Sequence, residues 1–431
     1  MNAHSMSAAA IIVGALVWLS PGTPATRYPQ LAMYSWMRGN GAPFVRADGT
    51  LDTATIKMQA RWDVVVLDPA GAMEHPNVLA MLRGFNPGIR LLAFALAHSS
   101  WPTSDSASYP AHYNKAVART DGWLYGVDGK PYWNANVNLA RRDSTGRYVT
   151  AEAVADTMAA DLIAPNLWDG IFVDVNCLSV DAGGIDYQRA GYRTRAAFDS
   201  GFAAGHRVLA ARLRSHAPPG FQLVGNCGPH AERDLWNGWM RENWPNQDGG
   251  TWTTNMIGMN DDPGYLADDS LYRAPTLMWL SSMPDVDELA DTLRAYSGES
   301  CRRLRFGLAS ATLAGGVHTF VWTQKDHLRG FTPSWYDEYS VNAQGHATGD
   351  ASCKGWLGRP LGGCYQAGVL WRRDFEHGAV LVNPTWQSAA TPTYGFARIA
   401  GRVCPKINTG AADSIAVLGG QDGLFLWRTP H

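Results

Sequence analysis

The sequence predicts an α/β protein, a (β/α)8 barrel followed by a small C-terminal β-sandwich domain. Eight short and nearly uninterrupted apolar runs recur between residues 31 and 324, as in parallel strands that are covered on both faces. Helical patterns separate most of these runs, and eight such units fit the length of a TIM barrel. After residue 330 apolar and polar residues alternate, which is typical of antiparallel strands.

The eight strands are expected in chain order at 31–37, 62–68, 89–98, 169–175, 221–227, 238–243, 274–282 and 317–324. Residues 193–220 predict a long helix with one apolar face, made of Phe198, Phe202, Leu209 and Leu213. Further helices are expected within 150–165 and 285–316, whereas the gap between the fifth and sixth strands barely holds one. A doubly wound sheet is the alternative fold, but no GxGxxG motif follows an early strand.

The chain divides into three expected parts. Residues 1–24 contain a short apolar run followed by Pro and Gly, which indicates a signal peptide or an N-terminal anchor. Residues 25–330 form the barrel, and 331–431 form a linker and the β-sandwich, with a hairpin inside 365–385 that turns at "FEHG". We therefore expect a secreted or periplasmic protein, tethered to a membrane only if the N-terminal segment is kept.

Composition narrows the partners and the chemistry. A net charge of −2 gives no basic surface for nucleic acid, and no motif indicates a nucleotide or other cofactor. The 18 Trp and 16 Tyr favour a glycan partner, although large cores also use aromatic side chains. The six Cys form no CxxC or Cys/His cluster, which argues against zinc. An even number in an exported chain favours disulfides, and we expect Cys353 to pair with Cys364.

Two acidic residues stand where strands end. In a barrel of this type the carboxyl ends of the strands converge on one open face, where active sites lie. Asp174 ends the fourth apolar run, "WDGIFVDVN", and Glu242 ends the sixth, "GWMREN". Two facing carboxylates are the equipment of a glycosidase. We expect Glu242, beside Trp239 and Trp244, to be the general acid, and Asp174 to stay ionised as the nucleophile.

Other polar and aromatic residues near strand ends are candidates for binding substrate. They are Tyr34, Trp36, Asp68, His98, Trp101, Asn176, Asn226, Asn243, Trp244, Trp279, Trp322, Gln324 and Asp326. Structural roles compete with each assignment. Asp174 could cap a helix, Glu242 could pair with Arg241, Asp68 could form a turn before Pro69, His98 could be a structural histidine, and each Trp could belong to the core.

The motifs resemble those of glycoside hydrolase-like family fifteen, a family of bacterial TIM-barrel proteins. The resemblance rests on "YSWMRGN", "WDVVVLDP", "LLAFALA", "WDGIFVDV", "VGNCG", "NGWMRENWP" and "VLWRRDFEHGAVLVNPT", in this order. More distantly, the layout is similar to the endo-α-1,4-polygalactosaminidase family, in which an Asp after strand 4 is the nucleophile and a Glu after strand 6 the acid/base. By strand position, this resemblance implies those roles for Asp174 and Glu242 in a retaining glycosidase acting on an α-linked polysaccharide.

Two other functions remain open from the sequence. A barrel could bind poly- or oligosaccharides without cleaving them, through its aromatic residues and its β-domain. A metal-dependent polysaccharide hydrolase or deacetylase could use Asp174, Asn176 and His98, although the sequence has no HxH or HExxH motif.

Overall fold

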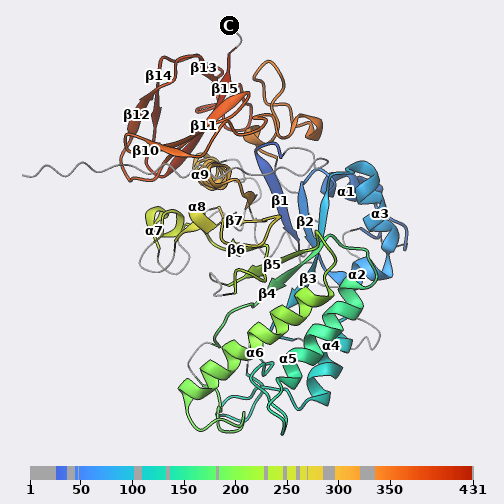
Figure 1. The fold of residues 1–431 in the computed structure, drawn as a ribbon. Helices are drawn as coiled ribbons and strands as arrows, with labels where there is room; N and C mark the ends of the chain where they lie inside the picture. Colours follow the sequence, from blue (N-terminus) through green and yellow to red (C-terminus); the bar gives the residue numbers. More distant parts are fainter. Residues whose placement is uncertain are drawn as a thin grey trace, which may run out of the picture.

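The computed structural model describes residues 26–35, 44–46, 48–100, 109–132, 136–180, 184–227, 232–245, 250–258, 263–268, 270–284, 297–320 and 335–429. Eight parallel strands close into a barrel in chain order, which confirms the predicted fold (Figure 1). They are β1 (Gln30–Ser35), β2 (Val64–Leu67), β3 (Arg90–Leu96), β4 (Gly170–Asp174), β5 (Gln222–Asn226), β6 (Gly238–Arg241), β7 (Trp279–Ser282) and β8 (Val317–Phe320).

The strands are buried on both faces, as their continuous apolar runs predict. One cluster of apolar side chains fills the inside of the barrel, and it includes Phe94, Phe172, Met240 and Trp279. A second and larger cluster lies between the strands and the surrounding helices. Each strand pairs with its chain neighbour, and β1 closes the ring against β8 at Gln30 and Val317.

Helices cover the outside of the barrel. They are α1 (Thr53–Gln59), α2 (Pro69–Glu74), α3 (Pro76–Phe85), α4 (Tyr109–Arg119), α5 (Val149–Met158) with its π-helical extension η1 (Ala159–Ile163), α6 (Arg195–His216), α7 (Trp252–Met256), α8 (Tyr265–Asp268) and α9 (Gly298–Ala314). The long helix α6 begins after Thr194, whose hydroxyl accepts from the amide of Ala197. Its predicted apolar face is fully buried, as expected for Phe198, Phe202, Leu209 and Leu213. Between β5 and β6 the described residues 232–237 contain turns and no full helix.

The C-terminal region is antiparallel. A five-stranded sheet has the order β13 (Phe396–Arg398), β15 (Asp422–Arg428), β11 (Gly378–Asn383), β10 (Leu370–Asp374), β9 (Tyr365–Ala367), and a two-stranded sheet pairs β12 (Ala389–Pro392) with β14 (Ile415–Leu418). Apolar side chains of β11, β13, β14 and β15 form one cluster between the two sheets. The predicted hairpin is confirmed, because β10 and β11 pair around the turn Phe375–Gly378.

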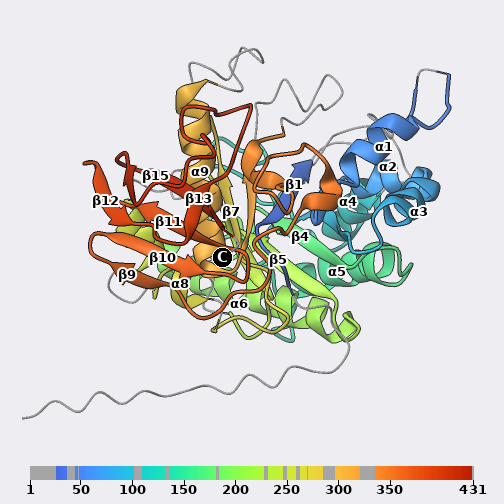
Figure 2. The same ribbon diagram turned by 90° about the horizontal axis from the view of Figure 1, so that it is seen from above.

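The C-terminal sheet packs against α9 of the barrel, as both views show (Figures 1 and 2). Arg305 on α9 forms a buried salt bridge with Asp422 on β15, at 2.8 Å between Nη2 and Oδ2. A disulfide between Cys301 on α9 and Cys404 joins the same two regions covalently. The barrel and the sheet are therefore held together by both polar and covalent contacts.

The predicted pairing of Cys353 with Cys364 is wrong. Both are free thiols, and the disulfides instead join Cys177 to Cys227 and Cys301 to Cys404. The chain between Cys353 and Cys364 does not turn back on itself, because it runs along two other segments. Gly358 pairs with Tyr28, and Pro360 pairs with Phe375. In the part of the chain that the structure describes, no helix is long and apolar enough to cross a membrane.

Candidate active site

Strand alternation directs the acidic side chains into the mouth of the barrel. Successive side chains of a strand point to opposite faces, so a residue two positions beyond an interior residue points inward as well. Phe172 and Met240 belong to the interior cluster, and they are followed two residues later by Asp174 and Glu242. Both acids are only partly buried, so they can be reached from the open end. The order of the barrel places β4, β5 and β6 side by side.

Asn226, at the end of β5 between them, connects the two carboxyl groups. Its side-chain Nδ2 donates to Asp174 Oδ1 at 2.8 Å and to Glu242 Oε2 at 3.1 Å. Since both oxygens contact one nitrogen, they lie less than about 6 Å apart, the two distances taken end to end. The amide offers one N–H to each carboxyl group. Asn226 thus bridges the two acids, whereas the sequence led us to expect a contact with substrate.

Asp174 accepts three hydrogen bonds from neutral donors. Besides Asn226, the backbone amide of Val175 donates at 2.8 Å to Oδ1, and the hydroxyl of Tyr34 donates at 3.1 Å to Oδ2. Burial raises the pKa of Asp174 above its usual value, and the three hydrogen bonds oppose that rise because they stabilise the anion. Burial also raises the pKa of Tyr34 well above 10, with the charge of Asp174 adding to it, so this hydroxyl remains a donor.

Glu242 is the acid with less support for its anion. Burial raises its pKa, and the charge of Asp174 raises it further, whereas the hydrogen bond from Asn226 opposes the rise. The neighbouring Arg241 does not compensate this charge. It lies on the outward side of β6, where its guanidinium stacks on Trp239 at 4.3 Å and donates to Asn255 at 2.9 Å. The sequence left open an ion pair between Arg241 and Glu242. In the structure, Arg241 instead contacts Trp239 and Asn255 on the outside of β6.

The backbone around the site is unusual. Val175, Cys227 and Asn243 each have a positive φ, of 48°, 106° and 53°, and each directly follows Asp174, Asn226 or Glu242. Non-glycine residues in this region cost on the order of 1–3 kcal/mol each and gather at functional sites. The disulfide Cys177–Cys227 links the segments after β4 and β5 at this point. The positive-φ residue at each of these strand ends therefore lies directly beside one of the two acids or beside Asn226, which bridges them.

A buried polar chain supports the end of β4 from behind. Asn176 Oδ1 lies 2.7 Å from His206 Nε2, and His206 Nδ1 lies 2.9 Å from Glu232 Oε2. Asn176 also donates its backbone amide to the carbonyl of Asn226 at 3.0 Å, which ties the ends of β4 and β5 together. Sequence reasoning missed His206 and Glu232. The signal for His206 was its position on the apolar face of α6, four residues after Phe202.

Two of the predicted substrate contacts, Asn176 and His98, have buried side chains. Asn176 is fully buried against His206. His98 is 2% exposed, and its ring meets Phe202 of α6 edge to face with centroids 5.1 Å apart. It lies two residues beyond the end of β3, where its ring joins the layer between the strands and α6. Burial lowers the pKa of His98 to about 3, so its ring is neutral.

Two of the tryptophans expected as subsites are also buried. Trp279 is fully buried inside the barrel, edge to face with Phe172. Trp244 is 3% exposed and packs on Phe306 of α9, with ring centroids 4.9 Å apart. Both rings belong to the core, because the strand ends place them facing other apolar side chains. The remaining aromatic and polar candidates of this kind lie outside the described residues: Trp36, Trp101, Trp322, Gln324 and Asp326.

Two further candidates lie at the mouth. Asn243 is exposed directly after Glu242. Asp68 is partly buried at the end of β2, where its carboxylate accepts from the amide of Ala70 and caps α2. Whether either contacts substrate stays a prediction. Within the described ranges, no three His, Cys, Asp or Glu side chains gather in a way that could hold a metal ion.

Solved structures with the same type of fold are only distantly similar. A maltogenic α-amylase from Thermotoga neapolitana is 10% identical with a TM-score of 0.46, and an α-glucosyl transfer enzyme, XgtA, is 13% identical with a TM-score of 0.47; each comparison covers 93% of this chain and 99% of the other. A dextranase from Flavobacterium johnsoniae is 10% identical with a TM-score of 0.42, over 94% of this chain and 52% of the other.

Comparison by sequence is more informative. No curated protein matches the chain. A family model described as hypothetical glycosyl hydrolase family 15 matches residues 83–379, which is more than half of the chain and includes β4, β5 and β6. The resemblance seen in the motifs is thereby confirmed, and the chain belongs to hypothetical glycosyl hydrolase family 15.

Proposed function

We propose that the protein is a secreted, retaining glycoside hydrolase that cleaves α-linked poly- or oligosaccharides, with Asp174 as nucleophile and Glu242 as general acid/base. The observation that carries this proposal is the double contact of Asn226, which limits the two carboxyl oxygens to less than about 6 Å. Retaining enzymes keep their carboxyl groups about 5–5.5 Å apart, whereas inverting enzymes need about 6.5–9.5 Å to admit a water molecule. The separation here favours retention.

The hydrogen bonds support the division of roles. A nucleophile must be ionised when it attacks, and Asp174 has three neutral donors that favour its anion. A general acid must hold a proton near the working pH, and the raised pKa of Glu242 serves that need. The proton of Glu242 passes to the glycosidic oxygen as Asp174 attacks the anomeric carbon, so the C–O bond to the leaving group breaks and an ester bond forms.

The second half of the reaction returns both acids to their starting state. Glu242, now a carboxylate, accepts a proton from water as the water oxygen attacks the anomeric carbon. The ester bond to Asp174 breaks, and the sugar leaves with the same anomeric configuration that it had in the substrate. Throughout, Tyr34 and the amide of Val175 hold the carboxyl group of Asp174 in place.

The substrate class and the location rest on other support. Family membership supports a glycoside as substrate. The α linkage rests on the resemblance to the endo-α-1,4-polygalactosaminidase family, in which the acids occupy the same strand positions. Two disulfides support an exported protein, because such bonds persist in oxidising compartments.

The experiment combines product analysis with a chemical rescue. Purified protein is incubated with a panel of α-linked bacterial and fungal polysaccharides, and the anomer of the first product is read by NMR. We expect the α anomer first. In Glu242→Ala, assayed on an activated aryl α-glycoside whose leaving group needs no proton from an acid, azide should restore turnover and give an α-glycosyl azide, because it needs no base to attack the ester on Asp174. A first product with inverted configuration contradicts the retaining mechanism, and glycan binding without any turnover supports a non-catalytic barrel instead.

A further inference from the structure

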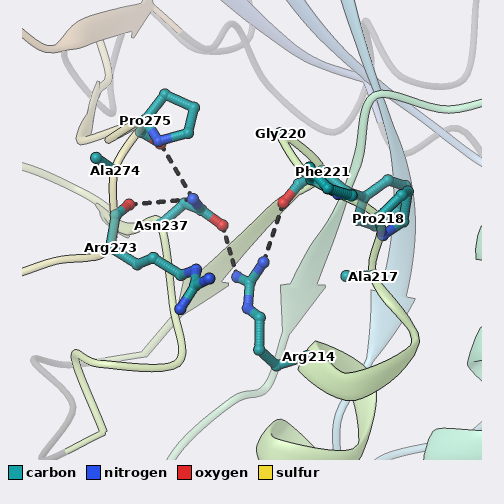
Figure 3. Close-up of a pocket in the computed structure, with 10 residues that line it drawn as sticks. Arg214, Ala217, Pro218, Gly220, Phe221, Asn237, Arg273, Ala274 and Pro275 are labelled. Atoms are coloured by element: carbon teal, nitrogen blue, oxygen red, sulfur yellow. Dashed lines mark hydrogen bonds between the residues drawn. The ribbon is translucent and has the colours of Figure 1, made fainter.

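A pocket lies at the amino ends of β5, β6 and β7, whereas the acid pair lies at the carboxyl ends of the barrel strands; Figure 3 shows the residues that line it. It is formed by the last residues of α6 and by the segments that lead into β5, β6 and β7, so it opens at the amino ends of these strands. Its volume is about 320 Å³. Pockets for small ligands start at about 300 Å³. The site proposed for catalysis lies at the carboxyl ends of the same strands and contributes nothing to this pocket.

Arg214, near the end of α6, forms a fixed wall of the pocket. Its Nε and Nη2 donate to the carbonyl of Leu235 at 2.9 and 2.7 Å, and Nη1 donates to the carbonyl of Phe221 at 3.1 Å. Nη2 also donates to Asn237 Oδ1 at 2.6 Å. Four of the five guanidinium N–H groups are therefore used, and one on Nη1 is left over. The acceptors are all neutral, so none of them balances the positive charge.

Arg273 brings a second positive charge to the same pocket. Its side chain extends toward the guanidinium of Arg214 (Figure 3). Arg273 is exposed, and among the described residues its guanidinium has no hydrogen-bond or salt-bridge partner. Burial and, to a smaller extent, the charge of Arg273 together lower the pKa of Arg214 to about 10. Two like charges therefore face one pocket.

The acids nearest in the chain are engaged elsewhere. Glu232 contacts His206 at 2.9 Å, and Asp234 pairs with Arg207 at 3.1 Å. Among the described residues, no Asp or Glu lines the pocket. Apart from the two arginines and Asn237 the lining is apolar, and it includes Pro218, Pro219 and Pro275, which we call the proline rim. Arg214 has a clear structural role, because its hydrogen bonds tie α6 to the starts of β5 and β6. The side chain of Arg273 takes no part in these hydrogen bonds.

We propose that this pocket binds the oxyanion group of a small molecule, a phosphate or a carboxylate, between Arg273 and the remaining N–H of Arg214. Guanidinium groups present planar pairs of donors that suit both anions. Arg214 supplies a fixed charge, and the exposed Arg273 closes on the ligand. The proline rim accommodates the uncharged body of a ligand such as a sugar acid.

The test is calorimetric titration of the full-length protein at constant ionic strength. The probes are inorganic phosphate, acetate and glucuronate, with chloride as the background anion. Arg273→Gln is compared with Arg119→Gln, an exposed arginine at the end of α4 that changes the charge by the same amount at a distant site. We expect saturable binding of at least one oxyanion, weakened at least tenfold by Arg273→Gln and unchanged by Arg119→Gln.

The three probes separate the sources of the anion. Tighter binding of phosphate than of the two carboxylates indicates a phosphate ligand, and tighter binding of glucuronate than of acetate indicates a sugar acid that uses the rim. Absence of saturable binding by every probe, or equal weakening by the two variants, overturns the proposal. Glycoside turnover by Arg273→Gln should equal that of the wild type, so failure here is distinguishable from failure of the proposed function.

Discussion

The two ends of strands β5 and β6 use the same kind of residue for opposite purposes. At the mouth, Asn226 donates to two side-chain carboxyl groups. At the base, Asn237 donates to the backbone carbonyls of Arg273 and Pro275, and accepts from Arg214 and from the amide of Leu223. The asparagine at the mouth thus bonds two titratable side chains, whereas three of the four hydrogen bonds of the asparagine at the base go to backbone groups.

The backbone conformation also differs between the two ends of the strands. At the mouth, three non-glycine residues take a positive φ, directly after Asp174, Asn226 and Glu242. At the base, the positive φ before β5 is taken by Gly220, which adopts it without steric cost. Beside the acid pair, positive φ at non-glycine residues therefore coincides with raised pKa values, whereas the segment that leads into β5 takes its positive φ at a glycine. If the proposed function holds, the mouth serves reactivity and the Asn237 network serves stability.

The largest effect should come from the acids at the mouth. In Glu242→Gln and Asp174→Asn we expect turnover to fall at least about 10³-fold, because each variant removes a group that acts in the transition state. Both proteins should fold, since both side chains reach the open end of the barrel. Turnover is measured on the best polysaccharide of the panel, and folding by circular dichroism. If Asp174→Asn merely unfolded, its role would be structural.

A matched pair of asparagine substitutions tests the comparison directly. Asn237→Ala should destabilise the protein by about 4 kcal/mol, because the buried Asn237 side chain loses four hydrogen bonds, at about 1 kcal/mol each. Well below its Tm, its turnover should stay near that of the wild type. Asn226→Ala should lower turnover about 10- to 100-fold by releasing both carboxyl groups, with a smaller loss of stability. Urea unfolding and initial rates measure the two effects, and equal effects on both quantities would remove the distinction between the ends.

Much of this contrast was available from the sequence. The continuous apolar runs locate every barrel strand, and their parity directs Asp174 and Glu242 inward once the barrel is assumed. The bridging role of Asn226 was not available, because it depends on the lateral order of β4, β5 and β6. The same dependence hid the disulfide of Cys177 with Cys227, whose partners are 50 residues apart and meet only when the barrel closes.

The tryptophans show a different limit. Their number and their places near strand ends indicated subsites, yet Trp244 and Trp279 are core residues. An aromatic side chain next to a strand end suits either environment, since its large apolar surface is stabilised by burial as well as by a sugar. Only the partners decide, and these are Phe306 on α9 and Phe172 inside the barrel. The amino-acid composition does not show which residues a tryptophan will contact in the folded protein.

Removing each disulfide in turn should distinguish effects on turnover from effects on stability alone. Replacing Cys301 and Cys404 with Ala removes the link between α9 and the C-terminal region, and should cost about 2–4 kcal/mol of stability with turnover unchanged well below the Tm. Replacing Cys177 and Cys227 should cost a similar amount and also lower turnover a few fold, because the segments beside Asp174 and Asn226 are released. Thermal unfolding and initial rates at 25 °C give both readings. Equal turnover in the two double variants would mean that the mouth is held without its disulfide.

The smallest effect is a gain of stability with a defined pH dependence. Since the pKa of Glu242 is higher in the folded than in the unfolded protein, the folded state holds the extra proton. Its contribution to stability is fully present below the unfolded pKa and is lost as pH rises through the folded pKa. At pH 7 Glu242→Gln should therefore be more stable than the wild type, by on the order of 1 kcal/mol.

The control for the direction of this stability change is the Glu→Gln substitution at Glu299. Hydrogen bonds and charges from Arg302 and Arg303 lower the pKa of Glu299 to about 2. Glu299 stabilises the folded state above its unfolded pKa, and this stability is lost as pH falls through about 2, so Glu299→Gln should be less stable at pH 7. Urea unfolding between pH 4 and pH 8 measures both differences. The advantage of Glu242→Gln should shrink toward pH 4, where the wild type also holds its proton. An advantage that did not change with pH would have to come from packing, and the buried charge at the mouth would then cost nothing.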